Sequence, residues 1–189
     1  MYKGKRVILA SQSPRRKQLL EQAGVAFEVK VVATEETFPE GMPVAEVPVH
    51  IARQKAAAVA TLCTSEDIVL TADTVVVLDE TIIGKPVDRE DAIRILTALS
   101  GRTHQVITGV VIRQGTSEQA FSKTTAVHFK PLTQEQIIYY IDTYQPFDKA
   151  GAYAIQEWIG AVGIDGINGC FYNVMGLPVS KVLEVLETM

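Results

Sequence analysis

The stretch Val7-Ile8-Leu9-Ala10-Ser11-Gln12-Ser13-Pro14-Arg15-Arg16 decides the fold, because a short apolar run leads directly into the start of a helix. The apolar run is too short for a helix and is bounded by small polar residues, so it predicts a buried strand. Ser13 can cap the first backbone N–H groups of a helix, and Pro14 suits the first helical position. We expect this helix to continue to about Ala23 and to end at Gly24. A strand that leads into a helix N-terminus predicts a place where phosphate can bind.

Arg15 and Arg16 place two positive charges at this helix start. Helix N-termini normally favour Asp or Glu, so the pair is either solvated surface charge or the basic part of an anion site. The charge distribution favours the anion site. Residues 1–17 contain no acidic residue, whereas the rest of the chain carries 12 basic and 22 acidic residues. The basic residues of this segment are Lys3, Lys5, Arg6, Arg15, Arg16 and Lys17.

The composition is that of an ordinary globular protein, with 47% hydrophobic and 21% charged residues in 189. We expect one domain over residues 1–189. A sequence pI near 5.4 argues against a nonspecific nucleic-acid binder and favours a small anionic ligand. No apolar run is long enough for a membrane span, and the N-terminus does not resemble a secretory signal. Cys63 and Cys170 have no metal-ligand spacing, which predicts buried thiols in a reducing cytoplasm.

Two adjacent carboxylates follow the next predicted strand. Phe27 to Val32 alternates apolar and polar residues, and Glu35 and Glu36 come after it. Such carboxylates are usually solvated, but they are also the oxygen ligands that Mg²⁺ uses beside phosphates. We then expect a helix from about Val49 to Leu62.

Lys55 lies in the apolar stripe of that helix. A lysine in this position either extends to water or reaches into a cleft, and the pattern alone favours neither.

The segment from Ile68 to Leu78 is the most strand-like part of the chain, because it is rich in β-branched residues. Asp73 stands at its centre. An unpaired buried carboxylate is costly, so Asp73 is either paired or metal-bound, or the strand breaks at Ala72-Asp73. Neither Gly nor Pro is present at that point, which argues against a break.

The remaining pattern predicts more strands and helices. Two long strands, Thr103 to Arg113 and Gln119 to Phe129, should pair antiparallel and make the sheet mixed. Helices are expected after the caps Asp88 and Thr133 and after Pro178, the last with Val182, Leu183 and Leu186 inward. Four glycines at every third position, Gly160, Gly163, Gly166 and Gly169, predict turns in a loose hairpin.

Six short motifs occur in order along the chain: Ser11-Gln12-Ser13-Pro14-Arg15-Arg16, Ala72-Asp73-Thr74, Gly84-Lys85-Pro86, Ser100-Gly101-Arg102, Asp148-Lys149-Ala150-Gly151-Ala152-Tyr153 and Gly176-Leu177-Pro178. Together they resemble the Maf family of nucleoside triphosphate pyrophosphatases over essentially the whole chain. The resemblance implies a Maf/inosine-triphosphatase-like α/β fold, in which helices flank a long twisted mixed sheet and two lobes surround a central cleft. It also implies a cytoplasmic, homodimeric enzyme that uses a divalent cation, commonly Mg²⁺ or Mn²⁺.

The resemblance also implies site residues. The catalytic aspartate falls on Asp73, and Glu36 is an acidic residue of the same metal site. The phosphate-binding cluster falls on Ser11, Arg15, Arg16, Lys55 and Lys85. The branch that is resembled acts on dTTP and UTP, and its specificity positions fall on Arg16, Thr74 and Gln156. The branch that acts on 7-methyl-GTP would have Trp-Arg-Arg after the proline and Ser-Asp-Gln in the central strand, and this chain has neither.

One departure from the family pattern follows Gln156, where Glu157-Trp158-Ile159 is bulkier than the usual glycine-rich continuation.

We therefore hypothesise that the protein is a hydrolase that removes unwanted nucleotides from the nucleotide pool (housecleaning). It would cleave dTTP and UTP, with CTP and modified pyrimidines as further candidates, between the α and β phosphates to give the monophosphate and pyrophosphate. The side-chain amide of Gln156 has both a donor and an acceptor, which matches the N3–H and carbonyl edge of uracil or thymine. The alternatives are a non-catalytic nucleotide-sensing regulator of septum formation and a purine or 7-methyl-GTP pyrophosphatase. No nucleic-acid or membrane partner is expected.

Overall fold

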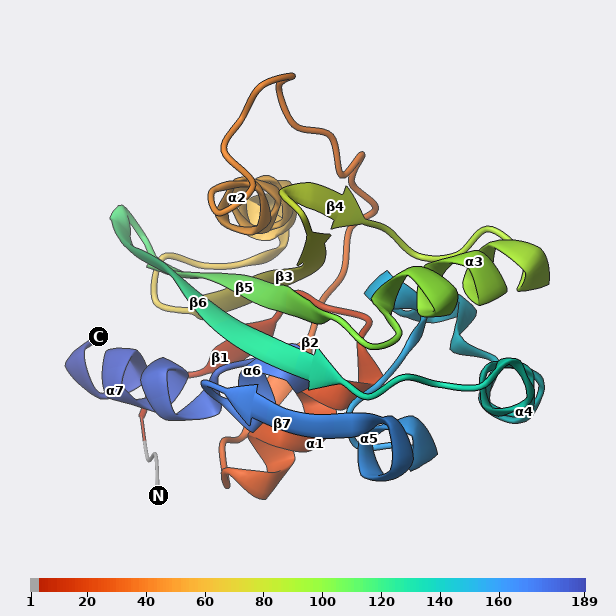
Figure 1. Cartoon of the computed structure of the whole chain (residues 1–189). Coiled ribbons are helices and arrows are strands. Elements are labelled where there is room, and N and C mark those ends of the chain that lie inside the picture. Colours follow the sequence, from red (N-terminus) through yellow and green to blue (C-terminus); the bar gives the residue numbers. More distant parts are fainter. Residues whose placement is uncertain (1–3) are drawn as a thin grey trace. The chain divides into compact units, whose positions relative to one another are not determined.

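A computed structural model describes residues 4–189 as a mixed α/β structure (Figure 1). The strands are β1 Val7–Leu9, β2 Phe27–Val29, β3 Ile68–Leu78, β4 Thr81–Ile83, β5 Thr103–Gln114, β6 Ser117–Phe129 and β7 Ile164–Asn168. The α-helices are α1 Pro14–Gln22, α2 Val47–Val59, α3 Arg89–Leu99, α4 Gln134–Tyr144, α5 Trp158–Gly163, α6 Phe171–Met175 and α7 Val179–Thr188. Three short 3₁₀ helices are η1 Ala60–Leu62, η2 Pro146–Asp148 and η3 Ala150–Ala152.

The strands form one mixed sheet in the order β2-β1-β3-β5-β6-β7, and β4 pairs with β3. β1 is parallel to both β2 and β3, whereas β4 is antiparallel to β3 and β7 is antiparallel to β6. The predicted mixed sheet flanked by helices is therefore confirmed. β1 is buried along its whole length, as expected for a short apolar strand between two parallel neighbours.

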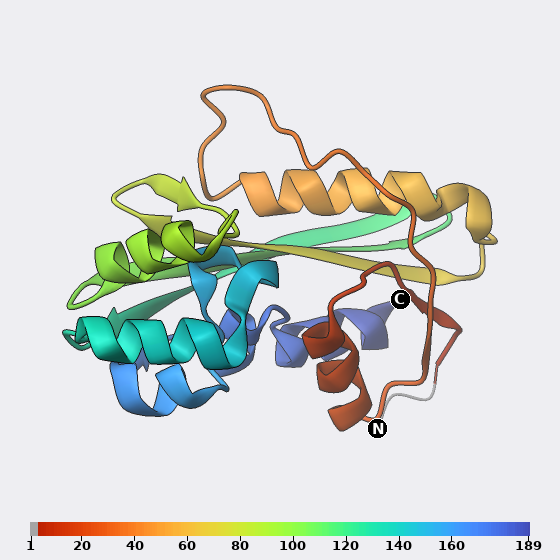
Figure 2. The same ribbon diagram turned by 90° about the vertical axis from the view of Figure 1, so that its right-hand side faces the viewer.

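The backbone divides into two compact units, and the first contains the chain up to Asp73, Thr108–Lys123 and Gly176–Met189. Within this unit, α2 lies on one face of the strands, whereas α1 and α7 lie on the other (Figures 1 and 2). Gly109 in β5 permits the close approach of α2, because a Cβ atom there would lie 2.3 Å from the backbone nitrogen of Val49. The start of α2 is thus fixed directly against the backbone of a strand.

The second unit contains Thr74–Ile107 and Thr124–Met175. In it α3 and α4 lie side by side (Figure 2). Its core includes the rings of His104, Phe129 and Tyr153, which pack edge to face with centroids 5.0 to 5.4 Å apart. Such contacts between aromatic rings stabilise a core beyond the area that they bury.

The predicted starts of α1, α3 and α4 are confirmed. The side chain of Ser13 accepts from the backbone N–H of Arg16, and that of Asp88 accepts from the N–H of Asp91. Thr133 and Gln136 form a reciprocal capping box at the start of α4.

Several predicted boundaries shift. β2 ends at Val29 rather than Val32, and α2 begins at Val47, earlier than expected, with its last turn tightened into η1. In α7 the buried residues are Val182, Val185 and Leu186, whereas Leu183 is only half-buried.

The prediction of a loose hairpin over the four regularly spaced glycines was wrong. Gly160 and Gly163 lie within α5, and Gly166 lies in β7, which pairs with β6. A Cβ atom at Gly163 would lie 2.8 Å from a methyl group of Leu132, so close packing rather than a turn explains that glycine. The predicted burial of the thiols was also wrong, since Cys63 and Cys170 are both half-buried.

None of the helices formed by residues 4–189 combines the length and the apolar character that crossing a membrane requires.

Candidate functional site

The start of α1 fixes Arg16 in a buried position. Arg16 is only 9% exposed, so the alternative that it is solvated surface charge is wrong. Its Nη1 donates to Oγ of Ser11 at 3.2 Å, and its Nε donates to the carbonyl oxygen of Gly176 at 2.8 Å. Oγ of Ser11 also accepts from the backbone N–H of Ser13 at 3.2 Å. The guanidinium is therefore held by segments from both ends of the chain.

The pKa of Arg16 shows which charges surround it. Burial lowers this pKa from its ordinary value, because the charged form loses hydration, and the negative charge of Asp73 is the largest opposing influence. The neighbouring charge of Arg15 lowers the pKa further, whereas the carboxylate of Glu36 raises it. The two carboxylates predicted for the site are thus close enough to Arg16 to act on its charge. The guanidinium stays protonated at neutral pH.

Lys55 joins these two carboxylates. Its Nζ lies 2.6 Å from Oδ1 of Asp73 and 2.8 Å from Oε1 of Glu36. The side chains of Lys55 and Asp73 are 16% and 12% exposed, whereas that of Glu36 is 46% exposed. Of the two alternatives for a lysine in an apolar stripe, the structure therefore supports the one in which Lys55 turns away from water towards a site.

Asp73 lies in an unbroken strand. β3 runs from Ile68 to Leu78 and is buried along almost its whole length, so the alternative of a break at Ala72-Asp73 is wrong. The ion pair with Lys55 compensates for the loss of hydration at the Asp73 carboxylate. The first unit thereby brings together most of the predicted residues: Ser11, Arg15, Arg16, Glu36, Lys55 and Asp73.

The other three predicted residues belong to the second unit. Thr74 follows Asp73 in β3 and is half-buried, whereas Lys85 and Gln156 are exposed. The segments that carry Lys85 and Gln156 are connected within this unit, because the backbone N–H of Gly151 donates to the carbonyl oxygen of Gly84 at 3.0 Å.

The carboxylates suit a metal ion only as part of a larger set of ligands. Among residues 4–189, no group of three or more His, Cys, Asp or Glu side chains could hold a metal ion. Glu36 and Asp73 nevertheless place carboxylate oxygens within 2.8 Å of the same Lys55 nitrogen. Mg²⁺ is commonly bound by one or two carboxylates, with waters and substrate phosphates completing the coordination. This donor set fits a cation that binds together with an anionic substrate.

Sequence reasoning missed the role of the Gly176 carbonyl. Its motif was recognised, but nothing in the pattern showed that its carbonyl oxygen would accept from Arg16. Gly176 has a φ of +115°, a conformation that glycine adopts without penalty. The motif Gly176-Leu177-Pro178 was the only sequence signal, and it marks the position without showing its partner.

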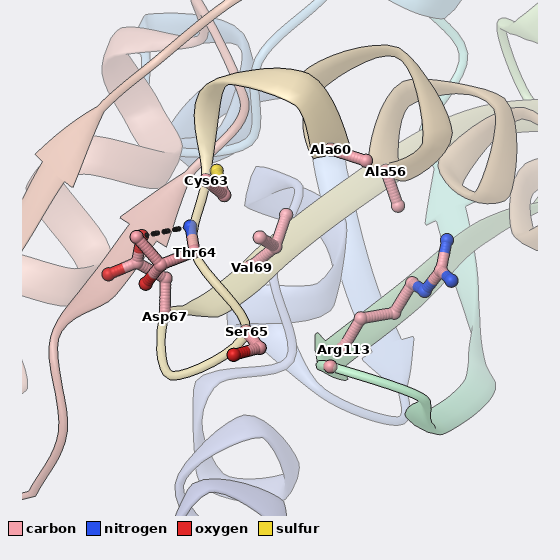
Figure 3. Close-up of a pocket in the computed structure, with 9 residues that line it drawn as sticks. Ala56, Ala60, Cys63, Thr64, Ser65, Asp67, Val69 and Arg113 are labelled. Atoms are coloured by element: carbon pink, nitrogen blue, oxygen red, sulfur yellow. Dashed lines mark hydrogen bonds between the residues drawn. The ribbon is translucent and has the colours of Figure 1, made fainter.

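A separate pocket of about 160 Å³ lies in the first unit, where the end of α2 meets β3 and the β5–β6 turn (Figure 3). None of the nine predicted site residues lines it. Its lining residues are Ala56, Ala60, Cys63, Thr64, Ser65, Asp67, Val69, Arg113 and Gly115. The carboxylate of Asp67 accepts from the backbone N–H of Thr64 at 2.8 Å and is therefore engaged within the protein.

Comparison with known proteins settles the family, because the chain matches the family of Maf-like proteins over residues 6–189. The chain belongs to the Maf family. It is 47% identical over 185 residues to the dTTP/UTP pyrophosphatase of Phocaeicola vulgatus, covering 97% of this chain and 96% of that protein. It is 49% identical over 185 residues to the dTTP/UTP pyrophosphatase of Porphyromonas gingivalis W83, covering 96% of this chain and 93% of that protein.

A solved structure of the Staphylococcus aureus Ham1 protein matches with a TM-score of 0.46 and 15% identity, over 66% of this chain and 72% of that one. The resemblance to the Maf family noted in the sequence is therefore confirmed by the family match and the two relatives.

Proposed function

We propose that this Maf-family chain is a nucleoside triphosphate pyrophosphatase that hydrolyses dTTP and UTP between the α and β phosphates. The observation that carries the proposal is the buried carboxylate of Asp73, which is held by Lys55 at 2.6 Å and influences the charge of the buried Arg16. A carboxylate among cations provides a base beside a binding place for phosphates. The names of the relatives support the same activity.

Asp73 acts as the general base in this proposal. It orients a water molecule and accepts its proton as the water oxygen attacks the α phosphorus. The bond from the α phosphorus to the bridging oxygen then breaks, and the electron pair leaves with pyrophosphate. The products are a nucleoside monophosphate and pyrophosphate.

The basic residues act on the triphosphate. Arg15, Arg16, Lys55 and Lys85, together with the Ser11 hydroxyl, neutralise the phosphates and the charge that develops on the leaving pyrophosphate. Because Arg16 is already fixed by Ser11 and Gly176, its guanidinium needs little reorganisation when substrate binds.

A divalent cation, Mg²⁺ or Mn²⁺, would be held by Glu36 and Asp73 together with phosphate oxygens and waters. When bound, it would neutralise phosphate charge and lower the pKa of a coordinated water.

In this proposal Gln156 selects the base, and Thr74 and Arg16 are further specificity positions. The amide of Gln156 can donate to a base carbonyl and accept from the base N3–H, which suits uracil and thymine. CTP and modified pyrimidines are further candidate substrates of the same site. The names of the relatives favour neither the septum-regulator alternative nor the purine and 7-methyl-GTP alternatives.

The direct test measures the products and the role of Asp73. UTP should yield UMP and pyrophosphate, and direct release of orthophosphate would indicate cleavage of a different bond. Asp73→Asn should bind nucleotide but lose hydrolysis by orders of magnitude. Asp79→Asn is a matched control, because Asp79 is an exposed carboxylate just beyond the end of β3 that pairs with Arg102. Near-normal turnover by Asp73→Asn would exclude Asp73 as the base.

Gln156 and the assembly are tested separately. Gln156→Ala should reduce the preference for uracil and thymine over purines, and an unchanged preference would reassign the base contact.

A cytoplasmic homodimer, which the family resemblance implies, would have about twice the 20.7 kDa mass of the chain in light scattering.

A further inference from the structure

Lys149 and Glu157 connect the two ends of the segment that carries Gln156. Lys149 is only 8% exposed, and lysine is almost never buried unless it is paired. Its Nζ lies 2.7 Å from Oδ1 of Asp148 and 3.7 Å from Oε1 of Glu157. The second contact spans eight positions of sequence, so it closes the segment into a loop.

Tyr140 of α4 connects the same carboxylate to the backbone of that segment. Its hydroxyl donates to Oε2 of Glu157 and accepts from the backbone N–H of Ala154 at 3.1 Å. The Tyr140 ring is fully buried and stacks on Tyr144 with centroids 5.0 Å apart. One rigid side chain therefore fixes the backbone before Gln156 and the carboxylate after it.

The start of the segment is also anchored. The backbone N–H of Gly151 donates to Gly84, and a Cβ atom at Gly151 would lie 2.9 Å from a methyl group of Val76. The hydroxyl of Tyr153 forms a hydrogen bond of 2.7 Å with Nε2 of His104. The exposed side chain of Gln156 thus extends from a backbone that is held on both sides.

We infer that Tyr140, Lys149 and Glu157 form a positioning clamp that sets the orientation of Gln156 and thereby the discrimination between bases. The inference rests on the proposed function, in which Gln156 contacts the base. The clamp residues act on Gln156 through its backbone. A recognition side chain selects well only when its support is rigid.

Glu157→Gln is the sharpest test, because it keeps the shape of the side chain and removes its charge. The preference for UTP over ATP, as the ratio of the two kcat/KM values, should fall about tenfold, because small misplacements of a contacting group are costly in rate. Inhibition by tripolyphosphate, which has no base, should be unchanged. Asp142→Asn is the matched control, since Asp142 is a carboxylate of the second unit that pairs with Arg89 at 2.7 Å. In Asp142→Asn, both the preference for UTP over ATP and the inhibition by tripolyphosphate should stay unchanged.

A second pair of variants tests whether the three residues act together. Tyr140→Phe and Lys149→Met should each reduce the same preference, and combining Lys149→Met with Glu157→Gln should add little to either single change. If Tyr140→Phe fails to fold, Glu157→Gln still decides the matter, because the Glu157 side chain is 21% exposed and its substitution is mild.

Two results would overturn the inference and leave the proposed function intact. One is an unchanged UTP preference in Glu157→Gln. The other is an equal loss for UTP, ATP and tripolyphosphate, which would indicate a general structural role. If the unmodified protein releases no pyrophosphate from UTP, the proposed function itself fails, and the inference fails with it.

Discussion

Replacing Lys55 with methionine removes the ammonium group that lies between the two carboxylates of the first unit. Methionine keeps an unbranched apolar stem in α2, so packing along the helix changes little. Asp73 loses a partner at 2.6 Å, and Glu36 loses one at 2.8 Å. The main consequence is that the carboxylate of Asp73 stays buried without the cation that compensates for it.

The burial of the three groups sets the size of the effect. The side chains of Lys55 and Asp73 are 16% and 12% exposed, and breaking such a pair by removing one partner costs about 3–5 kcal/mol. Glu36 is 46% exposed, so its pair with Lys55 contributes about 0–1 kcal/mol. Partial access of water to Asp73 favours the lower end of the range. We expect Lys55→Met to reduce the free energy of unfolding by about 3 kcal/mol.

Urea unfolding at neutral pH, followed by circular dichroism, measures this loss. The double variant Lys55→Met/Asp73→Asn should regain part of the lost stability, because the carboxylate that lost its partner is then neutral, whereas the buried Arg16 loses the charge that most favours its protonated form. Glu36→Gln serves as the control and should cost less than about 1 kcal/mol. A loss below about 1 kcal/mol in Lys55→Met, or no recovery in the double variant, would refute the buried ion pair.

Three further predictions concern the buried His104, the β3–β4 turn and the proposed divalent cation. Burial lowers the pKa of His104 to about 4, so the unfolded chain binds a proton at a higher pH than the folded one. The free energy of unfolding should therefore fall by about 2 kcal/mol between pH 7 and pH 5, and His104→Gln should flatten this slope in urea titrations. Glu80→Gly should raise stability by about 0.5–1 kcal/mol in thermal unfolding, because Asp79 and Glu80 adopt φ values of +49° and +62° in the β3–β4 turn. A lower melting temperature would contradict this. Removing divalent cations with EDTA should abolish pyrophosphate release from UTP, and adding Mg²⁺ should restore it; unchanged activity in EDTA would exclude the metal role of Glu36 and Asp73.

The sequence predicted those parts of the fold in which local and tertiary preferences agree. The β-branched run of β3 was predicted at its observed bounds, because these residues favour a strand and are also buried there. The start of α1 was predicted from Ser13 and Pro14, which act through local hydrogen bonding and backbone geometry. The helix α5 was missed because glycine is a poor helix former. Its glycines are needed instead for close packing, for example of Gly163 against Leu132.

The site was predictable in its residue types but not in its contacts. The apolar stripe of α2 left two alternatives for Lys55, because helical spacing does not show what lies opposite a side chain. Only the folded chain brings Lys55, Glu36 and Asp73 together across 37 positions of sequence. The Tyr140 hydroxyl bond to Glu157 was missed for the same reason: neither residue has a spacing that marks it as a pair.

Burial separates two kinds of charged residue in the proposed site. Arg16 and Asp73 are buried and Lys55 is half-buried, whereas Glu36 is exposed. The two cations and two anions balance, and the charges that lie away from water can persist because each is compensated by another. A triphosphate adds further negative charge, so its binding requires cations beyond this set. In the proposed mechanism these further positive charges come from Lys85, which is exposed, and from a divalent cation that would bind from solvent. Asp73, the base of the proposed mechanism, is already paired with Lys55 in the structure, because a buried carboxylate without a partner is costly.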